Sequence, residues 1–481
     1  MSDANALKSL HEVFARHASR TLLVLPDGKT IRYGELWAEA EQLARRLIRD
    51  GLAPGDRLLL RLENSPLLLR LYVACAIAGV VACPVDPALP RPRVAALERL
   101  LCPKRQLDDA GLAKLLDGPA APDGPLPADD PGRDFLVIYS SGTTGEAKGI
   151  VHSAGALVAG AVSFAALSEL REDSVIYHYF PMFYMAGIFN MIFCPAVVGA
   201  SIVVGPKFSP VEMLRFWELP KRFGVNHLTL TPTMAQSLCH LYRTDDALLA
   251  HLGRYQAVIS TSSVLYQSVA ERFHQTFGVP LRSCYGVTEV GGSITLQSWA
   301  DAVACEAVGH WRPEVSIRAG AGPDSPSEIL VKTPFMMTGY LGENGLTSPV
   351  DGEGYFHTGD VGYVQDGILH MTARESDLVK KGGEFVSLPM IENLVLRCGQ
   401  IAEAAMVAVP DPYWGNRLVL FYVPRAVGAS TPEEIEASLQ ALFTEGLRKI
   451  ERPDKLIPVP WLPKTTIGKT RKRDLIERYT L

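Results

Sequence analysis

The pattern of apolar and polar positions alternates between helical and extended periodicity over much of the chain. Residues 33–49 carry apolar side chains at three- and four-residue spacing, which predicts a helix with one buried face. Residues 56–61 and the apolar run 80–85 fit strands, and residues 67–79 between them fit a helix. Helix and strand alternate again from residue 155 to residue 259. This alternation predicts mostly parallel sheets with helices on their faces.

The pattern changes near residue 328 to short apolar segments separated by glycines, which indicates a run of short strands. The expected strands are 328–331, 354–356, 362–364 and 368–370. After residues 374–377 the character changes once more, and the rest of the chain mixes strands and helices. Residues 118–133 are dense in Pro, Gly, Ala and Asp and predict an exposed connection, not a core element.

Length and composition narrow the class of protein. A chain of 481 residues has room for two or more domains with sizeable cores. Its net charge of −5 argues against a nucleic-acid-binding protein with a basic face. Eight cysteines without a CxxC pair, mostly in apolar runs, predict buried free thiols in a reducing compartment.

The sequence shows no sign of a signal peptide or of a membrane-spanning helix. The first twenty residues carry charges throughout and lack the apolar core of a signal peptide. The longest apolar stretches, 71–85 and 191–205, are too short and too interrupted by Gly and Pro for a membrane span. We therefore expect a cytoplasmic protein without a membrane or nucleic-acid partner.

Residues 139–149, Tyr-Ser-Ser-Gly-Thr-Thr-Gly-Glu-Ala-Lys-Gly, place hydroxyls, glycines and one lysine in a single turn. Glycines let backbone N–H groups approach an anion, hydroxyls add donors, and Lys148 adds a point charge. The apolar run 135–138 before the turn predicts a buried strand. A strand feeding such a loop predicts phosphate binding. A flexible polar loop would explain the Gly and Ser residues but not the lysine at that position.

Two common nucleotide-binding classes do not fit this loop. The Walker pattern GxxxxGK[ST] requires a longer interval than that from Gly145 to Lys148, and Gly149 stands where it needs a hydroxyl. A Rossmann dehydrogenase would carry GxGxxG after its first strand, and that pattern is missing. The loop therefore belongs to another kind of phosphate site.

Five further motifs follow this loop in the chain. They are Tyr285-Gly-Val-Thr-Glu289, Tyr355-Phe-His-Thr-Gly-Asp360, Arg374-Glu-Ser-Asp377, Lys380-Lys-Gly-Gly-Glu384 and Pro463-Lys-Thr-Thr-Ile-Gly-Lys469. In this order and at these separations the motifs resemble the adenylate-forming superfamily of acyl- and aryl-CoA synthetases, acyl-carrier-protein synthetases, peptide-synthetase adenylation domains and luciferases. The resemblance spans residues 33–475.

The resemblance implies an α/β fold with two domains. Residues 1–375 would form a large N-terminal ATP- and acid-binding domain of helix-covered, mostly parallel sheets plus a small β-barrel-like part. Residues 376–481 would form a small, mobile α+β domain carrying the adenylation lysine. The implied activity is that of an AMP-forming acid–thiol ligase, active as a monomer or homodimer. A carboxylic acid would react with ATP and Mg²⁺ to give an acyl-adenylate and pyrophosphate, and a phosphopantetheine thiol would then displace AMP.

The resemblance also assigns residues to the nucleotide. The phosphate loop, with Lys148, would grip the β- and γ-phosphates through Ser140, Ser141, Gly142, Thr143, Thr144 and Gly145. Tyr285 would stack on adenine and Thr288 would donate to the α-phosphate. Glu289 is the expected Mg²⁺ ligand, because a carboxylate is a hard ligand for a hard ion.

Three more assignments lie towards the C-terminus. Asp360 would accept both ribose hydroxyls, a match that a carboxylate makes well, and Arg374 would reach the ribose or a phosphate. Lys469 would bridge the substrate carboxylate and the α-phosphate, and Gly468 lets its loop enter a crowded site. The nearby cations are expected to form a solvated basic face. They are Lys464, Arg471, Lys472 and Arg473.

Some positions depart from the family pattern. Ala147 replaces the proline usual before the loop lysine, which loosens the backbone but leaves the donors intact. Ser376 stands at the expected hinge, where Asp or Lys is usual, and Ala373 replaces the preceding glycine. These departures favour an alternative in which the protein is a non-catalytic, ligand-binding descendant. The presence of all four key residues opposes it: Lys148, Glu289, Asp360 and Lys469.

The acid pocket is expected around Tyr184, at the aromatic gate position where many CoA ligases carry histidine. No acidic residue lies in 180–190 to hold a substrate ammonium, so α-amino acids are disfavoured. Thr261 stands where deep acyl tunnels have glycine or alanine, which favours an aryl or short-to-medium acyl acid. Residues 260–263 are explained equally well as a polar strand end. The other expected pocket residues are Met185, Gly187 and Ser262.

The sequence does not decide which thiol accepts the acyl group. Gly382 and Gly383 would line the path of a phosphopantetheine arm. CoA and an acyl carrier protein share that arm, so both remain candidates, and the basic C-terminal residues would suit an acidic carrier protein. A further alternative is an adenylating enzyme that acts on an amino acid or passes its product to a non-thiol acceptor.

Overall fold

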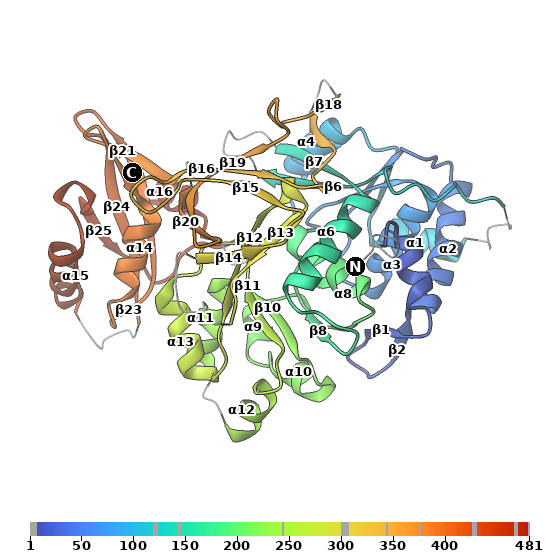
Figure 1. Ribbon diagram of the computed structural model, residues 1–481, viewed down its shortest axis with the longest axis horizontal. Coiled ribbons are helices and arrows are strands. Elements are labelled where there is room, and N and C mark those ends of the chain that lie inside the picture. The colour runs from blue at the N-terminus through green and yellow to red at the C-terminus, as the bar shows by residue number, and fades with distance from the viewer. Residues whose placement is uncertain are drawn as a thin grey trace.

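The computed structural model describes residues 7–118, 124–141, 147–242, 245–299, 307–342, 345–374, 377–425, 431–465 and 470–479, with the side chains of residues 140, 141, 147, 210, 373 and 385 left out. In Figure 1 the chain up to β20 forms one large body, and the orange-to-red C-terminal elements form a smaller body beside it. The predicted boundary at Ser376 falls between β20 and β21, outside the described residues, and stays a prediction.

The largest sheet has a parallel half and an antiparallel half. The parallel half contains β8 (Val175–His178), β9 (Ser201–Val204), β10 (His227–Leu230), β11 (Ala257–Ser260) and the start of β12 (Arg282–Val287), with β1 (Thr21–Val24) and β2 (Thr30–Arg32) at its edge. The antiparallel half contains β13 (Gly292–Leu296), β14 (Ala307–Trp311), β20 (Ile368–Arg374), β19 (Phe356–Gln365), β16 (Ser327–Lys332) and β15 (Ser316–Arg318). The antiparallel strands thus continue the parallel ones through β12 and β13.

A second sheet lies beside the first. Its strands, in spatial order, are β5 (Arg105–Leu107), β3 (Arg57–Leu60), β4 (Val81–Pro84), β6 (Asp134–Ser141), β7 (Ala147–Ser153), β17 (Gly339–Gly342) and β18 (Gly345–Thr347). Strands β3 to β6 are parallel, and β7 turns back antiparallel to β6. The phosphate loop predicted from the sequence therefore connects two antiparallel strands.

Helices cover both sheets. They are α1 (Leu10–Arg16), α2 (Tyr33–Arg49), α3 (Pro66–Ala78), α4 (Arg91–Leu101), α5 (Asp109–Asp117), α6 (Ala154–Leu167), α7 (Met185–Ile188), the π-helical η2 (Phe189–Phe193), α8 (Cys194–Val197), α9 (Pro210–Met213), α10 (Glu218–Phe223), α11 (Pro232–Leu241), α12 (Asp246–Leu252), α13 (Gln267–Phe277) and the short η3 (Thr288–Val290). Helix α6 touches strands of both sheets. Its sequence is apolar on nearly every face, as expected of a helix that packs between two sheets, and Val162 is an exposed apolar residue on it.

Local signals set the ends of the predicted helices. At α2 the N–H of Arg32 donates to the Glu35 carboxylate over 2.8 Å, which satisfies a backbone donor at the helix start. At α3 the hydroxyl of Ser65 accepts the N–H of Leu68, and Gly79 ends the helix with φ +68°. These caps explain why both helices match the ranges expected from periodicity.

The C-terminal part is α+β, as predicted. It contains β21 (Leu378–Lys381), β22 (Glu384–Ser387), α14 (Leu388–Leu396), β23 (Ile401–Asp411), β24 (Gly415–Pro424), α15 (Pro432–Gly446), the short η5 (Lys449–Glu451), β25 (Lys455–Pro458) and α16 (Lys472–Arg478). Helices α14 and α15 pack their apolar faces on the β23–β24–β25 sheet around Met406 and Leu420. This part therefore has a hydrophobic core of its own.

One expectation about strands was wrong. The separate strands predicted at 354–356 and 362–364 are a single strand, β19, which begins at Phe356. The segment before it is a turn, in which Asp351 accepts the N–H groups of Glu353 and Tyr355. The strand continues through Gly359 because irregularities in the ladder absorb its φ of +69°.

Two further expectations concern cysteines and membranes. Among the described cysteines, six are buried free thiols, as predicted, whereas Cys102 is exposed at the end of α4. Cys305 lies outside the described residues. No helix in the described ranges is both long and apolar enough to cross a bilayer.

Candidate active site

Several of the predicted site residues lie at one edge of the large sheet. Strands β8, β10, β11 and β12 run parallel, so their carboxyl ends share this edge. The segment after β8 carries Tyr184, Thr261 follows β11, and β12 contains Tyr285 and leads into Thr288 and Glu289. Loops at the carboxyl ends of open α/β sheets are where ligands bind. Topology alone therefore brings these distant motifs together.

Two residues from distant motifs meet around the buried carboxylate of Asp360. Tyr285 donates its hydroxyl to Oδ2 of Asp360 over 2.9 Å. Arg374 donates Nε to Oδ1 of Asp360 at 2.6 Å and Nη2 to Oδ2 at 3.4 Å. Asp360 is fully buried, whereas the Arg374 side chain is 46% exposed. The structure joins the residues assigned to adenine, ribose and phosphate, while those roles stay predictions.

The charge of Asp360 controls both of its neighbours. Burial and the nearby carboxylate raise the pKa of Tyr285 well above its ordinary value, so the hydroxyl remains a donor. Burial opposes the charge of Arg374, but the hydrogen bonds and charge of Asp360 outweigh it and raise the pKa of the guanidinium. Because Asp360 has no exposed surface, a ribose reaches its oxygens only after a neighbour moves. The half-exposed Arg374 has room to do so.

A second group surrounds Tyr340, a residue that the sequence analysis missed. Strand β17 pairs with β7 and places Tyr340 opposite Ile150. The exposed Lys148 holds its Nζ 5.2 Å from the Tyr340 ring centroid, and the Tyr340 hydroxyl donates to Oε1 of Glu289 over 2.9 Å. Tyr340 thereby links the phosphate-loop lysine to the predicted metal ligand. The signal available in the sequence was an aromatic residue next to Gly339, in a glycine-bounded hairpin.

Glu289 is suitably placed to hold a divalent cation. Its half-buried side chain is oriented by Tyr340, and its carbonyl accepts the N–H of Met337 at 2.9 Å. Over the described ranges, no three metal-ligating side chains form a cluster. Mg²⁺ does not need such a cluster, because it keeps several waters and uses one or two carboxylates together with substrate phosphates. The donor set therefore fits Mg²⁺ bound jointly with a nucleotide.

The segment leading to Tyr184 is held by hydrogen bonds. Asn64 donates Nδ2 to the Phe180 carbonyl at 2.6 Å and accepts the N–H of Met182 at 2.8 Å. Tyr72 donates its hydroxyl to the Met182 carbonyl at 2.6 Å. The half-buried Tyr184 then caps α7, which continues into the π-helical turn η2. Turns of this kind are frequent at functional sites, and the anchored backbone gives Tyr184 a defined position.

The other predicted pocket residues have distinct structural roles. At Gly187 a Cβ atom would lie 2.2 Å from the Pro181 carbonyl oxygen, so glycine is required there by backbone approach. Ser262 adopts φ +76°, and its hydroxyl is buried without a hydrogen bond to any described residue. A strained backbone and an unpaired buried hydroxyl at a strand end are features of ligand sites. Met185 and Thr261 are buried beside them.

Gly382 and Gly383 form the two-residue turn between β21 and β22. Lys381 pairs with Glu384 across it, and the glycines have φ +57° and +91°. Positive φ at both positions is the requirement of a type I′ hairpin turn. The turn accounts for both glycines structurally, and their place on the path of a phosphopantetheine arm stays a prediction.

Several predicted site residues lie outside the part of the chain that the structure describes. Lys469 and the predicted hinge Ser376 lie outside the described residues, as do four members of the phosphate loop: Gly142, Thr143, Thr144 and Gly145. The backbones of Ser140 and Ser141 extend β6 opposite Lys148 and Ala147, but their side chains are not described. The roles of all these residues stay predictions.

The two parts of the protein touch at a buried carboxylate. Tyr266, at the start of α13 in the large part, donates its hydroxyl to Oε2 of Glu392 over 2.7 Å. Within the small part, Nζ of Lys472 lies 2.8 Å from Oε1 of Glu392.

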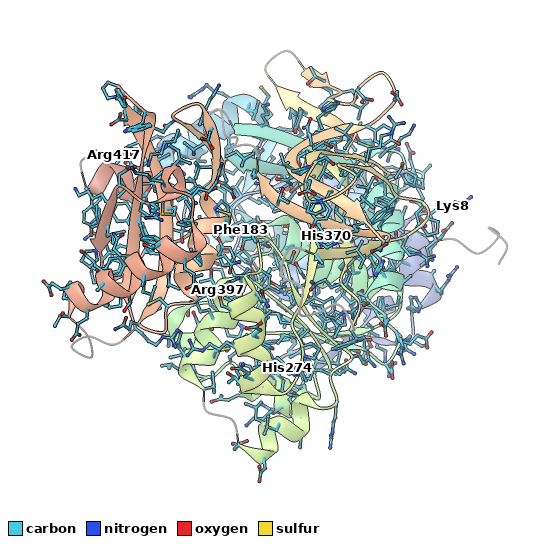
Figure 2. The ribbon with its side chains drawn as sticks, turned by 60° about the vertical axis from the view of Figure 1, so that its left-hand side comes forward. Lys8, Phe183, His274, His370, Arg397 and Arg417 are labelled. Atoms are coloured by element: carbon cyan, nitrogen blue, oxygen red, sulfur yellow. The ribbon has the colours of Figure 1, made fainter. Side chains whose placement is uncertain are left out.

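A cavity of about 500 Å³ also lies between the two parts. His370 lines it from the large part and Arg397 from the small part, and both are labelled in Figure 2.

One residue of the basic face expected near the C-terminus, Lys472, is not part of a solvated face. The Lys472 ammonium pairs with Glu392, whose side chain is only 9% exposed, so Lys472 belongs to the interface. The charge of Glu392 outweighs the effect of burial and raises the pKa of Lys472. Lys464 pairs with Glu403 at 2.7 Å, and Arg471 pairs with Asp474 at 3.0 Å. Lys472 therefore leaves the predicted solvated face, whereas Arg471 and Arg473 are exposed as predicted.

His152 is a further residue that the sequence analysis missed. It is fully buried in β7, just after the phosphate loop, and lies against the backbone of Thr288. Burial lowers its pKa to about 4, so the ring is neutral at physiological pH. Its only signal in the sequence is a polar residue inside an apolar strand.

Comparison with known proteins agrees with this geometry. The family described as AMP-binding enzyme matches residues 10–341, and the AMP-binding enzyme C-terminal domain matches residues 390–469. The chain belongs to the AMP-binding enzyme family. It is an AMP-forming acid–thiol ligase that uses ATP.

Individual relatives match the ligase over nearly its whole length. It is 28% identical to the indoleacetate–CoA ligase of Aromatoleum aromaticum, covering 98% of this chain and 99% of that one. It is also 28% identical to the long-chain-fatty-acid–CoA ligase of Thermus thermophilus, covering 93% and 90%. The ATP-bound structure of MatB from Rhodopseudomonas palustris, at 25% identity, superposes with a TM-score of 0.83 over 97% of this chain and 98% of that one. For apo MatB the TM-score is 0.73.

Proposed function

We propose that the ligase activates an aryl or short-to-medium acyl acid with ATP and Mg²⁺ and transfers the acyl group to the thiol of CoA. Two groups carry the proposal: Lys148 and Glu289 around Tyr340, and Tyr285 and Arg374 around Asp360. Tyr285 and Glu289 join the two groups because they belong to one motif. One group suits a triphosphate with its metal, and the other suits an adenosine.

Two displacement steps make up the reaction. In the first, a carboxylate oxygen of the acid attacks the α-phosphorus of ATP, and the bond to the bridging oxygen breaks to release pyrophosphate. In the second, the thiolate sulfur attacks the acyl carbon, a C–S bond forms, and the C–O bond to AMP breaks. Both steps concentrate negative charge, so catalysis requires fixed cations and donors where that charge develops.

The chain's own residues position the reactants. Lys148 places its ammonium over Tyr340, beside the phosphate loop. Glu289 would hold Mg²⁺, which neutralises phosphate charge when it is bound. Asp360 would hold the ribose once Arg374 has moved aside, and Lys469 would contact the reacting carboxylate and phosphate oxygens.

CoA is the acceptor that this structure favours over a carrier protein. Two of the cations that would have suited an acidic carrier protein, Lys464 and Lys472, are engaged with the carboxylates of Glu403 and Glu392. A carrier protein binds largely through charge complementarity, which such pairing weakens.

Carboxylate-dependent ATP–pyrophosphate exchange, measured over aryl, short, medium, long and amino acids without thiol, tests the proposal. Exchange with aryl or short-to-medium acids supports it, and thioester formation with CoA against a phosphopantetheinyl carrier protein then tests the acceptor. Exchange confined to long-chain or amino acids contradicts the substrate class. No exchange across the panel, with ATP still bound, favours a non-catalytic protein.

Replacing Glu289 by glutamine is expected to raise the Mg²⁺ concentration for half-maximal exchange by about tenfold or more, because an amide is a weaker ligand for a hard ion. A magnesium titration of the exchange rate measures this shift. Tyr340→Phe is the matched variant, since it keeps the carboxylate and removes only the hydroxyl that orients it. An unchanged Mg²⁺ requirement in Glu289→Gln would show that the cation binds elsewhere.

Replacing Tyr184 by alanine is expected to change the preference among acids much more than the KM for ATP. Tyr184 is the residue that precedes α7 at the sheet edge, and a tyrosine-sized gap in a pocket wall admits bulkier acids. Relative kcat/KM over the acid panel gives the comparison. A fixed preference together with weakened ATP binding would remove Tyr184 from the acid pocket.

A further inference from the structure

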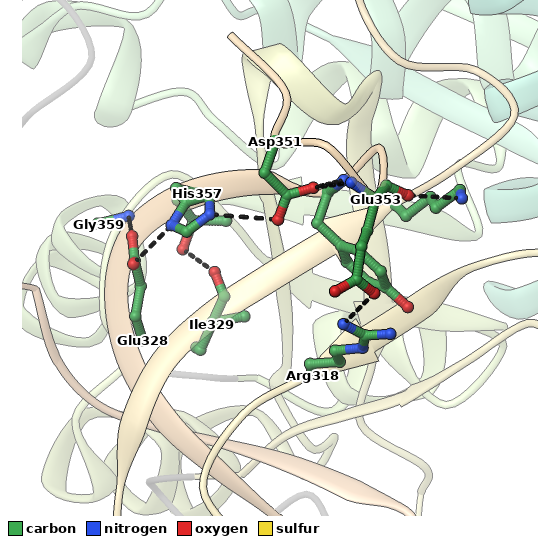
Figure 3. A network of polar contacts seen from close by, with 10 residues as sticks. Arg318, Glu328, Ile329, Asp351, Glu353, His357 and Gly359 are labelled. Atoms are coloured by element: carbon green, nitrogen blue, oxygen red, sulfur yellow. Dashed lines mark hydrogen bonds and ion pairs between the residues drawn. The ribbon is translucent and has the colours of Figure 1, made fainter.

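A polar network lies directly beside the Thr358–Asp360 segment and has no part in the reaction as described so far. Figure 3 shows Glu328, on β16, between His357 and Gly359 at the start of β19. Oε2 of Glu328 is 2.9 Å from Nδ1 of His357, and Oε1 accepts the N–H of Gly359 at 3.1 Å. The other ring nitrogen, Nε2 of His357, lies 3.4 Å from Oδ2 of Asp351.

The network stands where the backbone ladder between β16 and β19 is interrupted. Glu328 pairs with Val361 and Leu330 pairs with His357, with a register shift between them. Side chains take over the backbone bonds in this interval. Thr358 donates its hydroxyl to the Ile329 carbonyl at 2.7 Å and accepts the N–H of Asp360 at 3.1 Å.

Gly359 shows why this segment needs support. Its φ of +69° lies in the left-handed region, and a Cβ atom there would meet no other atom within 4 Å. Glycine is therefore needed for its backbone conformation and not for space. Glycine also leaves the backbone more free than any other residue does, so the conformation must be held from outside. The described contact that holds its N–H is the Glu328 carboxylate.

We propose that Glu328 is a positioning residue for nucleotide binding: by holding Gly359 and His357 across the bulge, it fixes the direction in which Asp360 presents its carboxylate to the ribose. Bulges beside active sites commonly re-aim one side chain in this way. The inference rests on the proposed ribose role of Asp360. Glu328 itself touches neither Asp360's carboxylate nor, by this proposal, the substrate.

His357 makes this support depend on pH. The groups facing its ring are Glu328 from β16 and Asp351 from the turn before β19, and both are carboxylates. Their hydrogen bonds and charges raise the pKa of His357 above its ordinary value of 6.5. Its protonated form is therefore favoured in the folded protein. The support is complete below pH 6.5 and weakens as pH rises through the raised pKa.

The test compares ATP with 2′-deoxy-ATP in the exchange reaction. If Asp360 accepts both ribose hydroxyls, the full-length enzyme prefers ATP, and the ratio of the two kcat/KM values measures how well Asp360 is aimed. Glu328→Ala is expected to raise the KM for ATP by about tenfold with kcat within about twofold, and to lower that ratio several-fold. Glu328→Gln, which keeps an acceptor for Gly359, is expected to recover part of both.

Glu353→Ala is the matched control. Glu353 lies in the same network region, but its carboxylate is 66% exposed and forms an ion pair with Arg318 at 2.8 Å, away from Gly359. Its loss should leave the KM for ATP and the ratio unchanged. Thermal unfolding of every variant separates positioning from stability. A lower Tm in Glu328→Ala with normal ATP parameters would overturn the proposal.

Asp360→Asn distinguishes the failure of this inference from failure of the proposed function. If Asp360→Asn lowers the ratio and Glu328→Ala does not, Asp360 binds the ribose but Glu328 does not aim it. If neither variant changes the ratio, the ribose role itself is wrong. The pH dependence of the ratio is a second readout, because both nucleotides share the same titrating triphosphate. The ratio should fall as pH rises in the wild type and stay flat in His357→Gln.

Discussion

Lys469→Ala is expected to reduce carboxylate-dependent ATP–pyrophosphate exchange by about 10²–10³-fold and to spare thioester formation from a supplied acyl-adenylate. The first step brings a carboxylate and a triphosphate together, and both are anionic. A lysine between the attacking oxygen and the α-phosphate offsets that repulsion where charge builds up. In the second step the acyl-adenylate already exists, so this cation is no longer required.

Measuring the two half-reactions separately tests this assignment. Lys464→Ala is the matched control, because Lys464 lies in the same C-terminal motif but pairs with Glu403. It should retain exchange close to the wild-type rate. Equal loss of both half-reactions in Lys469→Ala would show that the lysine acts in folding or domain placement instead of adenylation.

The second large effect concerns Asp360. Asp360→Ala is expected to lower kcat/KM for ATP by about 10²–10³-fold, because the buried anion that would accept both ribose hydroxyls is lost. It should also destabilise the protein by about 1–3 kcal/mol, since the buried Tyr285 hydroxyl loses its acceptor. Exchange kinetics over a range of ATP concentrations and denaturant unfolding measure the two effects.

Asp360→Asn separates activity from stability. The amide oxygen still accepts the Tyr285 hydroxyl, so most of the stability should return. The anion that would accept both ribose hydroxyls is absent, so ATP affinity should stay low. Tyr285→Phe keeps the carboxylate and its pairing with Arg374 and should cost far less ATP affinity than either change. Normal ATP kinetics in Asp360→Ala would contradict the ribose assignment, even if the protein became less stable.

Prediction from the sequence succeeded where the determining interactions are local. The helix expected over 33–49 is α2, because apolar spacing and the Arg32–Glu35 cap act within a few residues. The strand expected at 135–138 is the centre of β6. The motif residues were identified individually because each motif carries its own pattern of glycines, hydroxyls and charges.

Prediction failed or stopped where contacts join distant segments. Lys472 looks like part of a solvated face in a basic stretch, yet folding places it against Glu392, far away in the sequence. Tyr340 has no motif of its own that marks its contact with Glu289. The strands expected at 354–356 and 362–364 merge because β16 and β20 supply partners on both sides of β19.

By itself, the sequence determined the fold class, the local elements and the list of residues able to bind a nucleotide, since periodicity, capping and residue chemistry operate over short distances along the chain. Only the tertiary structure decided which of them meet. The parallel strands bring their carboxyl ends to one edge, and β17 carries Tyr340 between Lys148 and Glu289. The interrupted ladder places Glu328 against Gly359, the residue before Asp360. Such meetings depend on how whole sheets pack, which no local pattern encodes.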